Sequence, residues 1–170
     1  MARGSGTKED PWVLKTPPGT SEFTVYRDES LDPPALVCQV GKTTLSYDLR
    51  CLDDLHAMLK AHGDWMPLGS ADEQKPAAEG TVEAWARSAD NPVGGWYGLK
   101  KGLRGRFGNY VPPVMEAVGL AEVEHQPRNN RCALGSARLS RSRPRRSSRP
   151  GGRRRPRPAT PKRPHDRSCA

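Results

Sequence analysis

Basic and aromatic side chains alternate in one window of the sequence that contains no acidic residue. The window lies between Asp90 and Glu116 and holds Trp96, Tyr97, Lys100, Lys101, Arg104, Arg106, Phe107 and Tyr110. Cations of this kind contact phosphates, while aromatic rings stack on bases. The window therefore predicts a nucleic-acid-binding surface, with DNA and RNA both open. The alternative is a solvated helix face whose cations point to water and whose aromatic side chains lie in the core.

A second basic group follows on a turn at residues 128–131. Arg128 and Arg131 flank Asn129 and Asn130. Arginines at such a turn contact the nucleic-acid backbone, and asparagine amides reach base edges. The predicted nucleic-acid site therefore combines both groups, and its residues are Lys100, Lys101, Arg104, Arg106, Asn109, Arg128, Asn129 and Arg131.

Residue patterns typical of catalysis are weak in this chain. Gly41-Lys42-Thr43 lacks the upstream glycine of a phosphate-binding loop, because position 36 is a leucine, and a hairpin tip is the better interpretation. His56 and His62 are six residues apart and share no metalloprotease motif. Cys38 and Cys51 occupy apolar positions and are expected to be buried thiols. The sequence predicts no catalytic residue, no metal site and no cofactor, and it favours a binding protein over an enzyme.

The elements before this window follow clear local patterns. Two β-prone runs, 35–40 and 43–47, flank Gly41-Lys42 and predict a hairpin. A helix is predicted over 49–62, capped by Asp48 and ended by Gly63, with an apolar face of Leu52, Leu55 and Leu59 and an outer face of Asp53, Asp54 and Lys60. A further helix is predicted over 82–88, capped by Thr81, with Trp85 packing inward.

The C-terminal half is predicted as helix, short turn, helix and hairpin. Trp96, Leu99 and Leu103 have helical spacing and predict a helix over 96–108, weakened by its glycines. A second helix is expected from Val111, preceded by Asn109 or Tyr110 and ended by Gly119, and it is followed by a hairpin of 121–125 and 131–134. This order is that of a winged helix-turn-helix. The alternative is a helix–helix–hairpin that only closes the core.

The charge is divided between two different parts of the chain. Residues 1–134 contain 15 Lys/Arg and 18 Asp/Glu, whereas residues 135–170 contain 13 Lys/Arg and one acid, Asp166. The predicted organisation is a flexible N-terminal arm (1–10), one small α+β globular domain (11–134) and a disordered, basic, low-complexity Arg/Pro-rich tail (135–170). The tail is either a nucleic-acid-binding arm or a frame-shifted extension without a selected role.

A different partner class follows from the acidic part of the domain. Residues 1–90 contain nine Lys/Arg and 15 Asp/Glu. A non-catalytic interaction module that docks a basic protein partner is therefore the alternative function. The chain has no apolar run near the roughly 20 residues of a membrane-spanning helix and no signal-peptide pattern. We therefore expect no integral membrane association and a cytoplasmic location.

Four stretches of the sequence carry a resemblance to a known family: 16–20, 40–43, 94–107 and 128–131. With the sequence around them, from about Asp10 to Ala133, the chain resembles an uncharacterised family of small proteins from GC-rich Gram-positive bacteria. The resemblance implies one domain that ends near Ala133, with the tail outside it. It implies no activity and no catalytic residue.

Overall fold

The N-terminal part of the domain is a four-stranded antiparallel sheet. A computed structural model describes residues 2–135. The sheet has the order β1-β2-β3-β4, and its strands are β1 (Trp12–Lys15), β2 (Glu22–Asp28), β3 (Ala35–Val40) and β4 (Thr43–Asp48). The predicted β3–β4 hairpin is confirmed, with Gly41 in its turn at a φ of 58° that suits glycine. Leu45 and Tyr47 share the buried face, as their alternation predicts.

The predicted first helix is α1 (Cys51–His62), which begins and ends close to the expected residues. Its leucines are buried, and Gly63 closes it in the left-handed conformation with a φ of 73°. The Asp48 cap is wrong: Arg50 is the N-cap, and Asp48 only accepts a hydrogen bond from the Arg50 amide at 3.2 Å. Asp54 is also not an outer residue. Its side chain is 15% exposed and accepts a 2.9 Å hydrogen bond from the Tyr97 hydroxyl.

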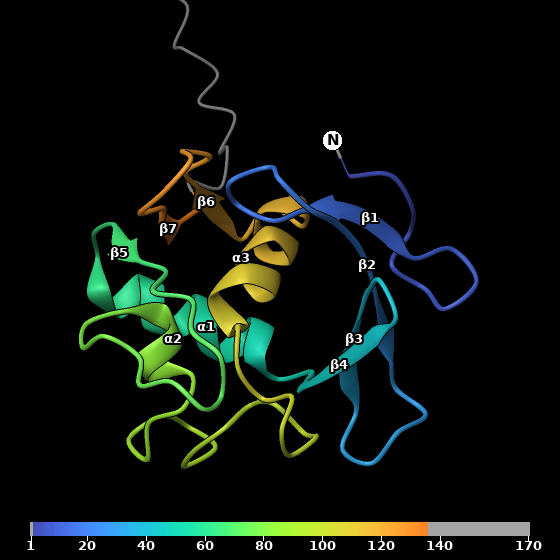
Figure 1. Cartoon of the computed structure of the whole chain (residues 1–170), viewed down its shortest axis with the longest axis horizontal. Helices are drawn as coiled ribbons and strands as arrows, with labels where there is room; N and C mark the ends of the chain where they lie inside the picture. Colours follow the sequence, from blue (N-terminus) through green and yellow to red (C-terminus); the bar gives the residue numbers. More distant parts are fainter. Residues whose placement is uncertain (1, 136–170) are drawn as a thin grey trace, which may run out of the picture. The chain divides into compact units, whose positions relative to one another are not determined.

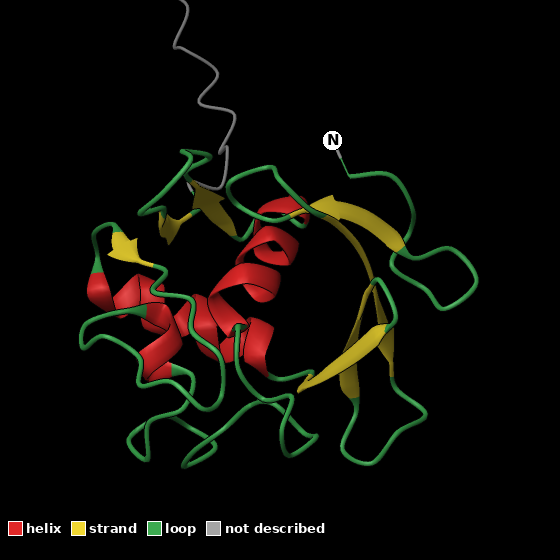
Figure 2. Cartoon of the chain, in the orientation of Figure 1, coloured by secondary structure: helices red, strands yellow, loops and turns green. Residues whose placement is uncertain are grey.

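The C-terminal part combines two helices with a second, three-stranded sheet. The helices are α2 (Val82–Trp85), capped by Thr81 as predicted, and α3 (Phe107–Ala117). The strands are β5 (Met66–Pro67), β6 (Ala121–Val123) and β7 (Arg131–Leu134), in the order β5-β7-β6. The predicted C-terminal hairpin is therefore confirmed, and the domain is of the α+β class, as Figure 2 shows by its mixture of helices and strands.

The helix predicted over 96–108 is wrong, because residues 96–106 form an irregular segment. Its backbone is paired with β4 instead: the Asp48 amide donates to Tyr97 at 2.8 Å, and the Leu99 amide donates to Ser46 at 2.8 Å. A Cβ atom on Gly98 would lie 2.4 Å from the Cα of Arg104, so the segment folds back closely on itself. The predicted pair of adjacent helices is absent from this segment, and the winged helix assignment that rested on it is not confirmed.

Helix α3 lies at the centre of the domain and joins its two sheets. It contacts α1, α2, β1 and β6 (Figure 1). Its residues from Phe107 to Met115 are buried with the single exception of Asn109, which is half-buried. Pro112 and Pro113 lie inside it, so two i→i−4 hydrogen bonds are missing from the helix. Tyr110 packs edge-on against Phe23 of β2, with ring centroids 5.0 Å apart.

The two ends of the chain were predicted to be flexible. In the N-terminal arm, the Val13 amide donates to the Arg3 carbonyl at 2.8 Å, and Asp10 accepts hydrogen bonds from the Ser5 backbone and side chain. The disordered tail predicted over 135–170 lies outside the described residues except for Gly135. None of the helices in residues 2–135 has the length and apolar composition needed to cross a membrane.

Candidate functional site

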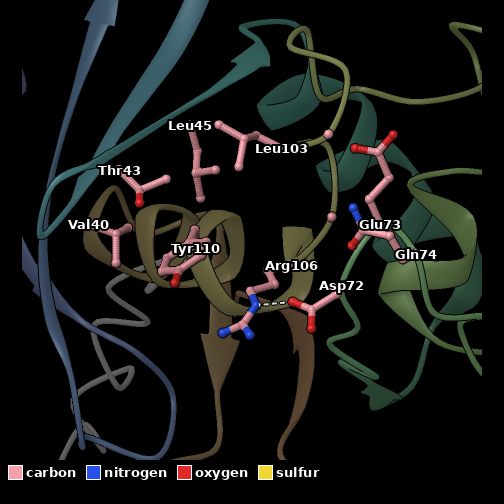
Figure 3. A pocket seen from close by; sticks show the side chains of 11 residues that line it. Val40, Thr43, Leu45, Asp72, Glu73, Gln74, Leu103, Arg106 and Tyr110 are labelled. Carbon is pink, nitrogen blue, oxygen red and sulfur yellow. Dashed lines mark hydrogen bonds and ion pairs between the residues drawn. The ribbon is translucent and has the colours of Figure 1, made fainter.

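Three arginines hold one loop, residues 71–75, which we call the strap. Arg106 pairs with Asp72, and Arg104 pairs with Glu73, its Nε lying 2.8 Å from Oε1 (Figure 3 draws the first pair). The Arg106 hydrogen bond lowers the pKa of Asp72, and the Arg104 hydrogen bonds lower the pKa of Glu73. Both acids are thus ionised at neutral pH, and each has an arginine beside it.

Arg87 anchors the strap from within the domain. Its guanidinium donates to the carbonyls of Ala71 at 3.0 Å and Lys75 at 2.8 Å. Arg87 also pairs with Glu83, one helical turn away, which is only 1% exposed. The other Glu83 oxygen accepts a 2.7 Å hydrogen bond from the amide of Gly108, at the start of α3. Burial raises the pKa of Glu83, although these donors act in the opposite direction.

The aromatic residues of the basic window are mostly part of the core. Tyr97 and Phe107 are 0% and 1% exposed, and Tyr110 is also buried. Trp96 is half-buried, and its ring lies beneath two guanidinium groups, that of Arg87 at 4.4 Å and that of Arg104 at 4.6 Å. These cation–π contacts already occupy the aromatic ring that a nucleic-acid base would use.

The predicted site residues of the first basic group divide into two kinds. Lys100 and Lys101 are exposed and make no ion pair with any other residue of the described part of the chain. Arg104 and Arg106 are two of the three arginines that hold the strap, and Asn109 is half-buried in the first turn of α3. The sequence window thus contains two free cations and two that are engaged within the domain.

The second predicted group lies on the loop between β6 and β7. Asn130 closes this loop, because its side chain accepts from the Gln126 amide at 2.6 Å and donates to the Gln126 carbonyl at 2.8 Å. Arg128 and Asn129 are exposed at the turn, where Asn129 has a φ of 56°. Arg131 instead pairs with Glu124, its Nη2 lying 2.7 Å from Oε1.

The two predicted basic groups lie at different places in the fold. Residues 100–106 precede the first residue of α3, whereas the loop over 124–130 follows its last residue by way of β6. An 11-residue helix spans about 16 Å, and the two segments lie toward opposite ends of α3 (Figure 1). A continuous positive surface that includes all eight predicted residues stays a prediction.

A pocket of about 230 Å³ lies between the β3–β4 hairpin, α3 and the strap. Leu45 and Tyr110 form its apolar part, while Asp72 and Arg106 stand at its charged part (Figure 3). No local sequence pattern indicates this pocket. Its walls come from three distant segments, and Arg106 is the one lining residue that belongs to the predicted nucleic-acid site.

Other reactive side chains are either buried or used in structural contacts. Burial raises the pKa of Cys38 and Cys51, and raises that of Cys132 to about 12, so these thiols are poor nucleophiles. His125 bridges Glu116 at 2.8 Å and the Pro17 carbonyl at 3.0 Å, and the Glu116 hydrogen bond raises its pKa. In residues 2–135, no group of three or more His, Cys, Asp or Glu side chains could hold a metal ion.

Comparison with known proteins assigns the domain to a family. Residues 4–134 match a family described as a family of unknown function, DUF6855, and the chain belongs to it. The match covers the domain and leaves the tail outside, as the resemblance implied. No curated protein and no solved structure matches the chain at a significant level.

Proposed function

We propose that residues 51–134 form a winged-helix-type module that binds nucleic acid through its wing, the loop over 124–130. A winged helix has the order helix, strand, helix, helix, strand, strand, and its first strand pairs with its last. The elements α1, β5, α2, α3, β6 and β7 follow this order, and the sheet order β5-β7-β6 matches as well. The 86–106 segment is then an insertion between the second and third helices.

The burial of α3 determines which part of the module can meet the nucleic acid. In a helix-turn-helix protein the recognition helix lies in the major groove and presents its side chains to the bases. Here β1 contacts the corresponding helix, and Tyr110 packs against Phe23. Reading of bases by α3 is therefore blocked by the first sheet. The proposed contact is to phosphates, and it has little sequence preference.

The observation that carries the proposal is the ordered, exposed wing. Asn130 fixes the loop through two hydrogen bonds to Gln126, so that Arg128 and Asn129 are presented without a large ordering cost. Arg128 makes no ion pair with the described residues and is free to contact a phosphate. The sequence that follows β7 adds 13 cations, and such a sequence strengthens phosphate binding whatever the base sequence.

The test is the salt dependence of binding to duplex DNA and to RNA by a chain truncated after Leu139. Arg128→Gln removes one phosphate contact and is expected to reduce the slope of log K against log salt by about 0.9. Lys42→Gln is the matched control, because Lys42 is exposed on the turn of the β3–β4 hairpin, which belongs to the other sheet. Absence of any binding by the truncated chain at low salt, or equal slopes for both variants, contradicts the proposal.

A protein-interaction module is the second candidate, and one observation favours it. Arg104, Arg106 and Arg131 are paired with acids of the domain, which lowers the positive charge offered to a nucleic acid. The residues of the first 90 positions are net acidic, which suits a basic partner. Salt-sensitive capture of a basic protein by a truncated chain that does not bind nucleic acid supports this function.

A further inference from the structure

The pocket beside the strap has one apolar part and one charged part. Leu45 and Tyr110 are 6% and 5% exposed, and together with Val40 and Leu103 they make the apolar wall. The side chains of Arg106 and Asp72 are 51% and 37% exposed, so the ion pair stands where the pocket meets solvent. A ligand that fits this arrangement has an apolar body and a polar head.

The ion pair at the mouth leaves hydrogen-bonding capacity for that head. Arg106 has five N–H donors, and Asp72 and Tyr110 engage only part of them. Asp72 binds Arg106 through Oδ1, and no donor within residues 2–135 reaches its Oδ2. Glu73 is different, because Arg104 occupies both of its oxygens. Unused N–H donors of the positively charged Arg106 and an unused oxygen of the negatively charged Asp72 thus lie next to each other.

We propose that this pocket binds a free α-amino acid with an aliphatic side chain. The carboxylate of the ligand is held by Arg106, its ammonium group by Asp72, and its side chain lies against Leu45, Leu103 and Tyr110. A zwitterion pairs with both side chains. An anion without an ammonium group is repelled by the Asp72 carboxylate, and a cation without a carboxylate is repelled by the Arg106 guanidinium. The volume of about 230 Å³ is below the roughly 300–1,000 Å³ of sites for drug-sized ligands, and it suits a body of this size.

The test is calorimetric titration of the full chain with L-leucine and three matched compounds. Glycine lacks the apolar body, 4-methylpentanoate lacks the ammonium group, and 3-methylbutylamine lacks the carboxylate. We expect saturable binding of leucine, and affinity lower by about 10-fold or more for each of the others, because each loses one of the stated contacts. Equal binding of leucine and either single-charge compound overturns the zwitterion assignment. Absence of saturable leucine binding overturns the site.

Two substitutions locate the binding in this pocket. Arg106→Gln and Asp72→Asn are each expected to weaken leucine binding by about 10-fold or more, since each removes one charged partner of the head group. Arg131→Gln is the matched control, because Arg131 is similarly exposed and also ion-paired but lies on β7 outside the pocket. Undiminished binding in both pocket variants overturns the proposal. The titration contains no nucleic acid, so its outcome is independent of the function proposed for the wing.

Discussion

The buried pair of Glu83 and Arg87 is predicted to be the most sensitive polar contact of the domain. Glu83→Ala removes the partner of a guanidinium whose side chain is 12% exposed, and it leaves the Gly108 amide without its acceptor. Breaking a buried pair in this way costs about 3–5 kcal/mol, because the Arg87 guanidinium then stays largely buried with backbone carbonyls as partners but no opposite charge beside it. That loss is a large part of the roughly 5–15 kcal/mol that stabilise an ordinary domain.

The assay is urea unfolding at neutral pH, followed by tryptophan fluorescence. Trp96 reports on the region directly, since its ring lies beneath the Arg87 guanidinium. Glu116→Gln is the control, because Glu116 is an exposed acid whose partner is His125. If Glu83→Ala lowers the free energy of unfolding by less than about 1 kcal/mol, which is the contribution of an exposed ion pair, the reasoning is refuted.

A double-mutant cycle separates the pair from the rest of its surroundings. The double variant of Glu83→Gln and Arg87→Met replaces both charges, and the glutamine retains an acceptor for the Gly108 amide. Its cost is expected to be smaller than the sum of the two single costs, because no uncompensated charge remains. Additive costs mean that the two side chains act independently and that the pair is not the stabilising unit.

Three further predictions concern the core, the tail and pH. Leu55→Ala, at a fully buried position of α1, is expected to cost about 2–5 kcal/mol in urea unfolding, whereas Asp53→Ala on the exposed face changes stability little. Truncation after Leu139 removes a sequence with few apolar residues, so calorimetry is expected to show a melting temperature close to that of the full chain. The raised pKa of His125 means that folding favours its protonated form. The natural chain is therefore expected to be more stable than His125→Gln below pH 6.5, and this difference is lost as the pH rises through the folded-state pKa. Urea unfolding at several pH values measures it.

Local patterns predicted the elements whose stability is decided locally. The β3–β4 hairpin and α1 combine apolar periodicity with a glycine at the required turn, and both were located within one or two residues. The segment over 96–106 has helical spacing too, but pairing with β4 and the close approach at Gly98 decide its conformation. A spacing rule does not detect such long-range contacts, because it compares only neighbours in the sequence.

The candidate site was predictable only in part for the same reason. The cations of residues 100–106 were visible in the sequence, but the acids that neutralise Arg104 and Arg106 precede them by 31 and 34 residues. Glu83 and Arg87 have the i,i+4 spacing of a helical ion pair, which was the one local signal for their contact. Their burial follows from the packing of α2 against α3, and the sequence alone does not reveal it.

The central position of α3 has a consequence for the order in which the chain folds. Contacts of α3 and of the segments that flank it span the sequence. Phe23 packs on Tyr110 of α3, the Tyr47 hydroxyl donates to the Gly105 carbonyl before α3, and the Pro17 carbonyl contacts His125 after β6, across 108 residues. The first sheet therefore lacks the cover for its apolar face until the C-terminal third has been synthesised. Contacts of such large sequence separation slow folding, because loop closure precedes the gain from packing. During translation, the nascent sheet exposes the side chains that α3 later buries, and this interval is when the chain is most prone to aggregate.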